Sequence, residues 1–210
     1  MLEKIGASGY ETLSRPRLQT ARHVGRMVRR REYPMVAEIG IGIGATTRQL
    51  AKVMNNKGEL HIFDFEEKVQ ELKSDLSNLG FTNIVTHGNT AKYWDSYHWS
   101  LAKLLDKHKG PIFDYVYLDG AHTILHDLAA FAIIDKLLKP HGVVDLDDYD
   151  WTFASSKSMA DVRSAYMTEE QERAPQVKFI VDHFLTGNPK YRVLVKNRIF
   201  RKRKNRLVWL

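Results

Sequence analysis

The most constraining feature of this chain is the glycine-rich stretch VAEIGIGIGATTRQLA, residues 36–51. Gly40, Gly42 and Gly44 stand two residues apart, between a short apolar run and a segment with helical spacing. Glycine tolerates positive φ and leaves no side chain between the backbone and a ligand. The stretch therefore predicts a strand, a tight turn and a helix N-terminus that suits a flat or charged group. Without further support, a plain strand-to-helix turn explains the same glycines.

The same order of strand and helix repeats along the chain through residue 150. The expected strands are residues 35–39, 58–64, 82–89, 113–119 and 143–150, and the expected helices are residues 17–32, 46–55, 66–80, 97–108 and 123–138. Such alternation builds a mostly parallel, doubly wound sheet covered by helices on both faces. Ligands of these α/β folds bind at the carboxyl ends of the strands, so the candidate chemistry is expected just after each strand.

Beyond residue 150 the pattern changes. Residues 151–175 are polar and longer than a plain connection, which indicates a lid. A helix over 176–185, a turn over 187–189 and the paired runs 191–197 and 199–210 predict a closing antiparallel hairpin. We expect an N-terminal helical segment, residues 1–34, that contacts the substrate or a second copy of the chain. The main domain is expected over residues 35–210.

Composition limits the compartment and the class of site. A chain of 210 residues can bury one full core, and it has no cysteine, which excludes disulfides and thiolate metal sites and fits a reducing compartment. The first residues lack an apolar signal-peptide core, and the longest apolar run, residues 128–134, is too short to cross a bilayer. A soluble, cytoplasmic protein is expected.

The net charge of +7 is concentrated in two clusters, residues 21–32 and residues 196–206. Anionic partners such as nucleic acid or a membrane surface would suit these clusters. The alternative is a solvated strand edge whose cations discourage pairing with another edge, and this structural interpretation is preferred.

Polar residues at the next two strand ends indicate an adenosine. Asp64 ends the second strand about twenty residues after the glycines, where a carboxylate can accept both hydroxyls of a ribose. Phe65 could cover an adenine face, and Asn89, beside Thr90, could hydrogen-bond an adenine edge. The glycine spacing matches the dinucleotide fingerprint GxGxxG poorly, which disfavours a nicotinamide-dependent dehydrogenase.

The stretches EIGIGIGATT, FDFEE and HGNTAKYW, with the order of strands and helices that joins them, resemble the class I S-adenosylmethionine-dependent methyltransferases over about residues 36–149. The resemblance implies a Rossmann-like methyltransferase fold, with Glu38 orienting the methionine portion of the cofactor and Asp64 holding the ribose. Asn89 departs from the more usual Asp at the adenine position. The expected cofactor-binding residues are Glu38, Gly40, Gly42, Gly44, Thr46, Asp64, Phe65, Asn89 and Thr90.

A narrower resemblance lies in FDYVYLDGAHTILHDLAAFAIIDKLLKPHGVVDLDDYDW. This stretch is similar to the metal-dependent small-molecule O-methyltransferases of the macrocin and mycinamicin type and their cephamycin-biosynthesis relatives, through Asp-Gly-x-His and Asp-Asp-Tyr. The usual Lys-Pro-Gly-Gly turn is here Lys-Pro-His-Gly, residues 139–142. The resemblance implies that Asp119, Asp147 and Asp148 bind a divalent cation and that His122 is the base, so Asp119 and His122 are the expected catalytic residues.

The residue chemistry agrees with this resemblance. Three carboxylates at adjacent strand ends form a hard oxygen site, suited to magnesium or manganese. The alternative is that the acids after the fifth strand are turn and cap residues, and Asp145 and Asp150 are left without a role. His126, one helical turn after His122, could share its face.

The expected function is methylation of a hydroxyl of a small molecule, a sugar, glycoside or diol. A magnesium ion would lower the pKa of the hydroxyl, and His122 would take its proton. One rival is a nucleic-acid methyltransferase, although the Asn/Asp-Pro-Pro-aromatic motif of base-amino methylation is replaced here by Asp119-Gly-Ala-His122. A non-catalytic adenosyl-binding protein is the other rival.

Overall fold

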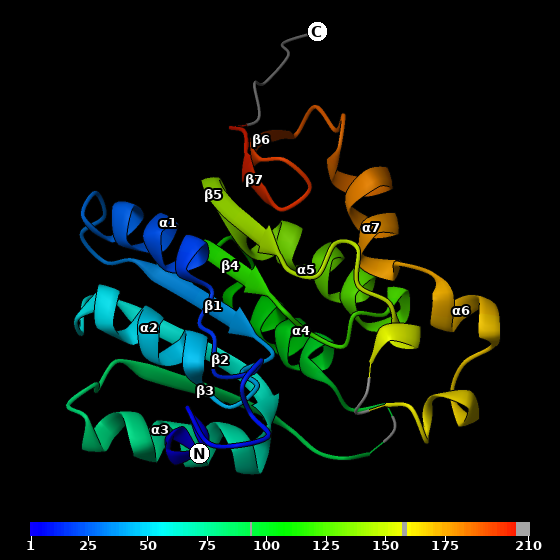
Figure 1. The fold of residues 1–210 in the computed structure, drawn as a ribbon. Coiled ribbons are helices and arrows are strands. Elements are labelled where there is room, and N and C mark those ends of the chain that lie inside the picture. Colours follow the sequence, from blue (N-terminus) through cyan, green and yellow to red (C-terminus); the bar gives the residue numbers. More distant parts are fainter. Residues whose placement is uncertain (93, 157–158, 205–210) are drawn as a thin grey trace, which may run out of the picture.

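The computed structural model describes residues 1–92, 94–156 and 159–204, and these residues form one seven-stranded sheet (Figure 1). The strand order is β3-β2-β1-β4-β5-β7-β6. The strands are β1 Met35–Ile39, β2 Glu59–Phe65, β3 Ile84–Asn89, β4 Phe113–Leu118, β5 Leu138–Leu146, β6 Tyr191–Val195 and β7 Ile199–Lys202. The first five pair in parallel, whereas β7 runs antiparallel to both β5 and β6. The expected α/β fold, with a closing antiparallel hairpin, is confirmed.

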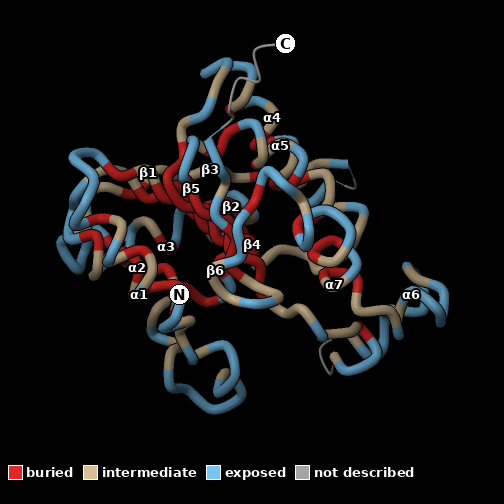
Figure 2. The backbone as a smooth tube through the Cα atoms, turned by 90° about the horizontal axis from the view of Figure 1, so that it is seen from above, coloured by how far each residue is buried: buried red, intermediate tan, exposed pale blue. Residues whose placement is uncertain are grey.

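Helices cover both faces of this sheet. On one face lie α1 Leu18–Val28, α2 Ala45–Met54 and α3 Glu66–Asn78, and on the other lie α4 Tyr97–His108, α5 Ala129–Leu137 and α7 Gln176–Ile180. Each face has its own hydrophobic core cluster. Seen from above, the buried stretches gather along the central strands, and the outer loops are exposed (Figure 2). All six residues of β4 are buried, as expected for a parallel strand covered on both sides.

A buried ion pair joins the closing hairpin to the rest of the sheet. The Asp145 carboxylate in β5 accepts hydrogen bonds from Tyr115 (2.7 Å), Thr20 (2.7 Å) and the Arg198 guanidinium (2.9 Å). Asp145 is fully buried, and burial raises the pKa of its carboxyl. Asp145 therefore joins β5 to β4, to α1 and to the turn before β7, although no role was predicted for it.

Several element boundaries differ from the sequence expectations. The first helix ends at Val28 rather than residue 32, and β5 begins at Leu138, so the expected turn over residues 139–142 belongs to an irregular strand start. Pairing with β4 explains the early start, because Leu138 is in register with Phe113 and the Ile112 amide donates to the Leu137 carbonyl (2.7 Å). The Lys202 ammonium group also donates to the Asp135 and Leu138 carbonyls near this junction. Residues 124–128 and 181–185 are single π-helical turns beside α5 and α7. The last part of the expected hairpin, residues 205–210, lies outside the described residues.

The two segments without regular structure also have defined paths. The chain before α1 contains one 3-10 turn, Leu2–Lys4, and then lies beside the carboxyl ends of β1 and β2 (Figure 1). The described part of residues 151–175 contains two 3-10 turns and the short helix α6, Glu169–Arg173, which projects from the side of the sheet. None of the described helices is long and apolar enough to cross a membrane.

A chain of side chains runs through the face covered by α4. Tyr33 donates to Glu59 (2.7 Å), Glu59 lies 2.9 Å from His61 Nε2, and His61 Nδ1 lies 2.8 Å from His87 Nε2. A carboxylate only accepts, so His61 donates from Nε2 and its Nδ1 accepts from His87. Burial lowers the pKa of His61, and it lowers the pKa of His87 to about 3.

This network predicts a pH-dependent stability. The unfolded chain protonates His87 near its ordinary pKa of 6.5, but the folded chain does so only near about 3. Between these values the unfolded state binds more protons, so the free energy of unfolding should rise as the pH is raised. His87→Gln keeps a donor for His61 and should flatten this dependence, as measured by urea unfolding between pH 4.5 and pH 7. The exposed His108→Gln should leave the slope as in the native chain; equal slopes in all three proteins would contradict the assignment.

Candidate active site

The loops after β1 and β4 come closest to each other where Gly40 lies against Asp119. Gly40 has a φ of +80°, and an added Cβ would lie 1.9 Å from the Asp119 carbonyl oxygen. Its amide donates to the Phe63 carbonyl (2.9 Å), and the Asp119 amide donates to the Ile39 carbonyl (2.9 Å). Three strand ends are thereby joined, and no residue with a side chain fits at Gly40.

The other two loop glycines have different roles. At Gly42, with a φ of +53°, an added Cβ would meet no atom within 4 Å, so the backbone there faces open space. Gly44 has a φ of +85° and immediately precedes α2, and its Cβ would lie 2.5 Å from Leu72 Cδ1 and 2.9 Å from Leu2 Cδ2. Gly44 is therefore required for packing, and Gly42 is the glycine that leaves room for a ligand.

Glu38 in β1 carries a buried, unsatisfied oxygen. The residue is 1% exposed, and its Oε2 makes no hydrogen bond of standard geometry among the described residues. The buried Thr47 hydroxyl, which is likewise unsatisfied, is a potential donor to this carboxyl. Burial raises the pKa of the Glu38 carboxyl well above its usual range. Native proteins rarely leave such an atom unsatisfied. An ammonium group, such as that of the methionine portion of S-adenosylmethionine, would supply the missing donor, so Glu38 fits the role that the resemblance implies.

Asp64 lies at the end of β2 and holds the glycine loop. Its Oδ2 accepts from the Ile41 amide (3.1 Å), and its Oδ1 accepts from the Phe65 amide (2.7 Å) and lies 3.4 Å from Lys68 Nζ. A carboxylate has about four acceptor positions, so hydroxyl donors can still be accommodated. Ribose binding by Asp64 stays a prediction that this geometry permits.

The residues expected near the adenine lie beside Asp64. Phe65 is aligned with Asn89 on the neighbouring strand β3. Phe65 is 46% exposed, so its ring is free to be covered, and Asn89 is buried with its amide donating to the Thr90 carbonyl (3.2 Å). The Thr90 amide and hydroxyl both donate to Asp95 (2.7 and 2.8 Å). Thr90 is thus occupied by a local contact, whereas Phe65 is available to a ligand.

Asp119, His122 and Asp148 meet at the carboxyl ends of β4 and β5. One ligand atom of each lies within 4.8 Å of the others. His122 Nε2 is 3.7 Å from Asp119 Oδ1 and 3.5 Å from Asp148 Oδ2. Both His122 and Asp148 have positive φ, at 56° and 59°, which non-glycine residues adopt uncommonly and which occurs preferentially at functional sites.

Asp147 lies beside this cluster but faces other partners. It accepts from the Tyr117 hydroxyl (2.6 Å), forms an ion pair with Arg17 Nε, and lies 3.5 Å from Arg198 Nη1. Its side chain is only 6% exposed. The three aspartates expected to bind a cation are therefore close together, but they are paired unequally: Asp147 contacts two guanidinium groups, whereas Asp148 has one longer contact with Arg17 (3.5 Å).

The Tyr117 hydroxyl also lies 2.8 Å from Asp119 Oδ2. Burial, and then the charge of Asp147, raise the pKa of the Asp119 carboxyl, and the same two causes raise the pKa of Asp148. One hydroxyl proton cannot serve two carboxylates well, so an Asp119 that holds a proton would donate it to the Tyr117 oxygen. The edge has an excess of negative charge, which favours binding of a cation.

The loop from Asp119 to His122 is fixed from below by Tyr97 and Asp127. The Tyr97 hydroxyl donates to the buried Asp127 and accepts from the Ala121 amide (3.0 Å). An added Cβ at Gly120 would lie 2.6 Å from both the Tyr97 and the Asp127 oxygens. Glycine is thus the residue that fits in the Asp-Gly-x-His stretch.

His126 faces away from this cluster. Its Nδ1 lies 2.8 Å from the Thr123 hydroxyl, and its ring neighbours are Tyr97 and His98. His122 instead packs against Trp151, with ring centroids 4.9 Å apart. The first residue of the expected lid therefore contacts the expected base.

Three residues near the site were not found by sequence reasoning. Tyr117 lies two residues before Asp119 on the same strand face, and that period of two could have identified it. Tyr97 starts a helix, and Arg17 directly precedes another helix, outside both basic clusters. Their contacts connect distant parts of the chain, so no local pattern marks them.

Removing the Tyr97 hydroxyl should loosen the loop. Tyr97→Phe removes the hydroxyl that donates to the buried Asp127 carboxylate and accepts from the Ala121 amide, and the expected loss in the free energy of unfolding is about 1–3 kcal/mol. Urea unfolding measures this loss. Tyr166→Phe is the control, because Tyr166 is 71% exposed and should change stability little. A Tyr97→Phe protein as stable as the native chain would show that the clamp is not needed.

Comparison with known proteins places this geometry in a family. A family model described as a methyltransferase domain matches residues 37–149. A sequence comparison with curated proteins finds no match.

Solved structures share the fold at low sequence identity. The O-methyltransferase TomG from Streptomyces achromogenes, involved in tomaymycin synthesis and solved with S-adenosylmethionine, has a TM-score of 0.60 at 17% identity, over 97% of this chain and 89% of its own. The O-methyltransferase from Bacillus cereus, solved with S-adenosylhomocysteine, has a TM-score of 0.61 at 16% identity, over 97% and 90%. Cofactor-bound Rv0187 from MTB has a TM-score of 0.65 at 14% identity, over 97% and 88%. At such identities these similarities show the fold.

Proposed function

The chain belongs to the methyltransferase domain family, and from this premise we propose that it transfers the methyl group of S-adenosylmethionine to a hydroxyl of a small molecule, a sugar, glycoside or diol. One observation carries the proposal. The unsatisfied Glu38 oxygen and the open backbone at Gly42 belong to the end of β1, and the cluster of Asp119, His122 and Asp148 belongs to the neighbouring ends of β4 and β5. A methyl donor bound at the end of β1 and an acceptor bound at the ends of β4 and β5 would thus lie close together.

Similar structures support the choice of cofactor. TomG was solved with S-adenosylmethionine and the Bacillus cereus enzyme with S-adenosylhomocysteine. In this chain Glu38 would receive the ammonium group, Asp64 the ribose and Phe65 the adenine face. These assignments extend the resemblance residue by residue.

The reaction is an in-line displacement. The acceptor oxygen forms a bond to the methyl carbon, the bond from that carbon to sulfur breaks, and the electron pair stays on sulfur as a neutral thioether. The hydroxyl proton passes to His122, which once protonated would form ion pairs with Asp119 and Asp148 at the observed distances. A divalent cation, probed first as magnesium, would polarise the acceptor hydroxyl when bound, and the carboxylates at this edge are the oxygen ligands that suit it.

Internal contacts of the C-terminal basic residues support the small-molecule assignment over a nucleic-acid methyltransferase. Arg198 pairs with buried Asp145, and Lys202 pairs with Asp135 (3.4 Å). These two cations stabilise the hairpin and are engaged within the protein, whereas Arg201, Arg203 and Lys204 of the same cluster are exposed. Residues 205 and 206 of the basic cluster lie outside the described residues.

The cofactor assignment predicts two losses of affinity. Asp64→Ala should weaken binding of S-adenosylhomocysteine by about 1–3 kcal/mol, because hydrogen-bonding groups lose a partner. Gly42→Val should weaken it further, since its side chain would enter the open space. Gly187→Val is the matched control: Gly187 also has a positive φ and open space, but it lies in the turn before β6. Calorimetry measures all three, and equal effects of the two valine variants would refute the ligand site.

The acceptor side should affect chemistry rather than cofactor binding. Asp148→Asn or a chelator should abolish methyl transfer and change affinity for S-adenosylhomocysteine little, because the carboxylate contacts the acceptor's cation. His122→Ala should lower turnover about a hundredfold or more, the usual range for a general base, and His126→Ala should be mild. The assay is a methyl-transfer screen of hydroxylated sugars, glycosides, diols and RNA with and without magnesium. Full activity in a chelator, or methylation of RNA alone, would reject this proposal.

A further inference from the structure

Arg17 from the N-terminal segment lies in the carboxylate edge. Its Nε pairs with Asp147 and its Nη2 is 3.5 Å from Asp148 Oδ1. Its backbone amide donates to the Thr46 hydroxyl (3.1 Å) in the first turn of α2, directly after the glycine loop. One residue thus contacts both the loop expected to bind the cofactor and the acids expected to bind the cation.

The two acids that follow β5 differ in how much of their carboxylate is available. Asp147 is 6% exposed, and its Oδ2 contacts both Tyr117 and Arg17 while its Oδ1 faces Arg198. Asp148 is 28% exposed, its Oδ2 faces His122, and its Oδ1 has only the 3.5 Å contact with Arg17. A divalent ion bound by Asp147 Oδ2 at about 2.0–2.6 Å would need the position that Arg17 holds, because two cations cannot share one carboxylate oxygen at such distances. At Oδ1 the ion would lie beside the Arg198 guanidinium.

His122 has only long contacts with Asp119 and Asp148. The distances of 3.5 and 3.7 Å from His122 Nε2 to Asp148 and Asp119 are too long for good hydrogen bonds. Carboxylate oxygens from Asp119 and Asp148 are therefore not fully used by protein donors. They are the acids of this edge that can still accept a cation.

We propose that Arg17 is a positioning residue that acts as the resident cation of this edge. It withdraws Asp147 from the ligand set, so that a divalent cation is held by Asp119 and Asp148, with His122 beside it. Loss of the guanidinium would free Asp147 and tighten cation binding. This inference rests on the proposed function, which supplies the cation, and it changes the ligand set expected from the sequence.

Titration of Mn²⁺ into the full chain, followed by calorimetry, tests the inference without an activity readout. Arg17→Met should bind Mn²⁺ on the order of tenfold or more tightly than the native chain, because a positive charge a few ångströms from the ion is removed and a carboxylate is freed. Arg17→Gln should behave alike and replaces it if the methionine variant unfolds. Thermal unfolding of each variant confirms the fold.

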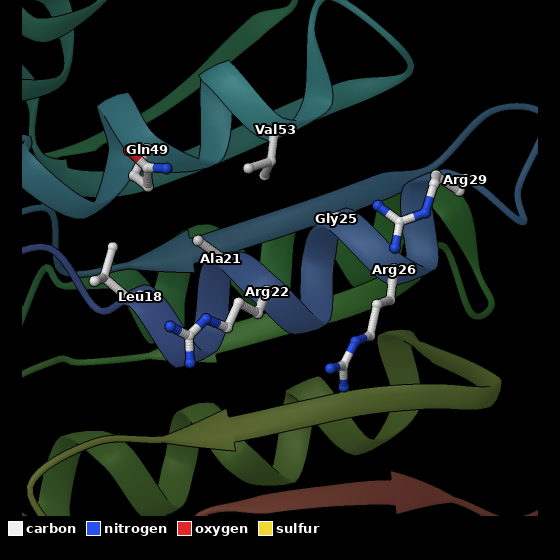
Figure 3. A pocket seen from close by; sticks show the side chains of 8 residues that line it. All are labelled: Leu18, Ala21, Arg22, Gly25, Arg26, Arg29, Gln49 and Val53. Atoms are coloured by element: carbon white, nitrogen blue, oxygen red, sulfur yellow. The ribbon is translucent and has the colours of Figure 1, made fainter.

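Arg22→Met is the matched control. Arg22 is exposed in α1, the helix that follows Arg17, and its side chain lines a groove of about 320 Å³ between α1 and α2 (Figure 3). Among the described residues, the ion pairs of Asp147 and Asp148 involve Arg17, Arg198 and His122 but not Arg22. Arg22→Met removes the same charge as Arg17→Met. Its Mn²⁺ affinity should nevertheless stay within about threefold of the native value, since exposed charges farther apart are screened. An increase equal to that of Arg17→Met would reduce the effect to net charge and overturn the inference.

The double variant Arg17→Met with Asp147→Asn decides the role of Asp147. If Arg17 already withholds Asp147, the double variant should return to within about threefold of the native affinity, because charge and ligand set are both restored. A double variant that binds Mn²⁺ over tenfold more weakly than the native chain would show that Asp147 is a ligand despite Arg17. An Arg17→Met protein with unchanged or weaker affinity would also overturn the inference.

Asp148→Asn separates this inference from the proposed function. It should weaken Mn²⁺ binding in both the native and the Arg17→Met background. If no variant binds Mn²⁺, the cation of the proposed function fails and the inference falls with it. If Mn²⁺ binds and Asp148→Asn weakens it, while Arg17→Met has no effect, the inference alone is wrong.

Discussion

The close approach of Gly40 to Asp119 is the constraint on which the site depends. β1 and β4 are central neighbours in the sheet, but the chain continues from β1 toward β2 and β3 and from β4 toward β5, in opposite directions. Their loops therefore separate at the carboxyl edge, which is where α/β sheets of this kind bind ligands. The close approach needs a glycine with positive φ, since a Cβ would lie 1.9 Å from the carbonyl of Asp119. From this point the glycine loop extends over one half of the sheet and the loop with His122 extends over the other.

Negative charge accumulates around this close approach, and separate segments of the chain supply one hydrogen-bond donor and two cations. Tyr117 donates from within β4, Arg17 comes from the segment before α1, and Arg198 comes from the turn between β6 and β7. Buried carboxylates without partners are costly, so each of these contacts stabilises the fold as well as the site. Glu38 keeps one oxygen without a standard hydrogen bond among the described residues, and it lies directly before the glycine loop in the chain. Under the proposed function this oxygen, rather than the paired Asp147, would accept from a ligand.

Local periodicity predicted the architecture because it acts within each element. The apolar runs of parallel strands and the amphipathic spacing of helices are properties of a few neighbouring residues, and they gave the order of elements to within a few positions. Boundaries failed where pairing with a remote strand decided them. Leu138 pairs with Phe113 of β4, so β5 starts before the turn that Lys139, Pro140 and Gly142 suggested.

The site was predictable to the extent that strand ends define it. Asp64, Asp119 and Asp148 lie where the alternation of elements places them, since carboxyl ends of parallel strands meet at one edge. The distribution of charge within that edge was not predictable, because Arg17 and Asp147 are brought together only by the tertiary fold. Equal carboxylates in sequence thus become unequal in structure: Asp147 is neutralised from the side of α1, while Asp148 faces His122 and, through it, Trp151. Arg17 borders Asp148 and Trp151 borders His122, so under the proposed function the N-terminal segment and the 151–175 segment, rather than the sheet, would select the hydroxyl that reaches this edge.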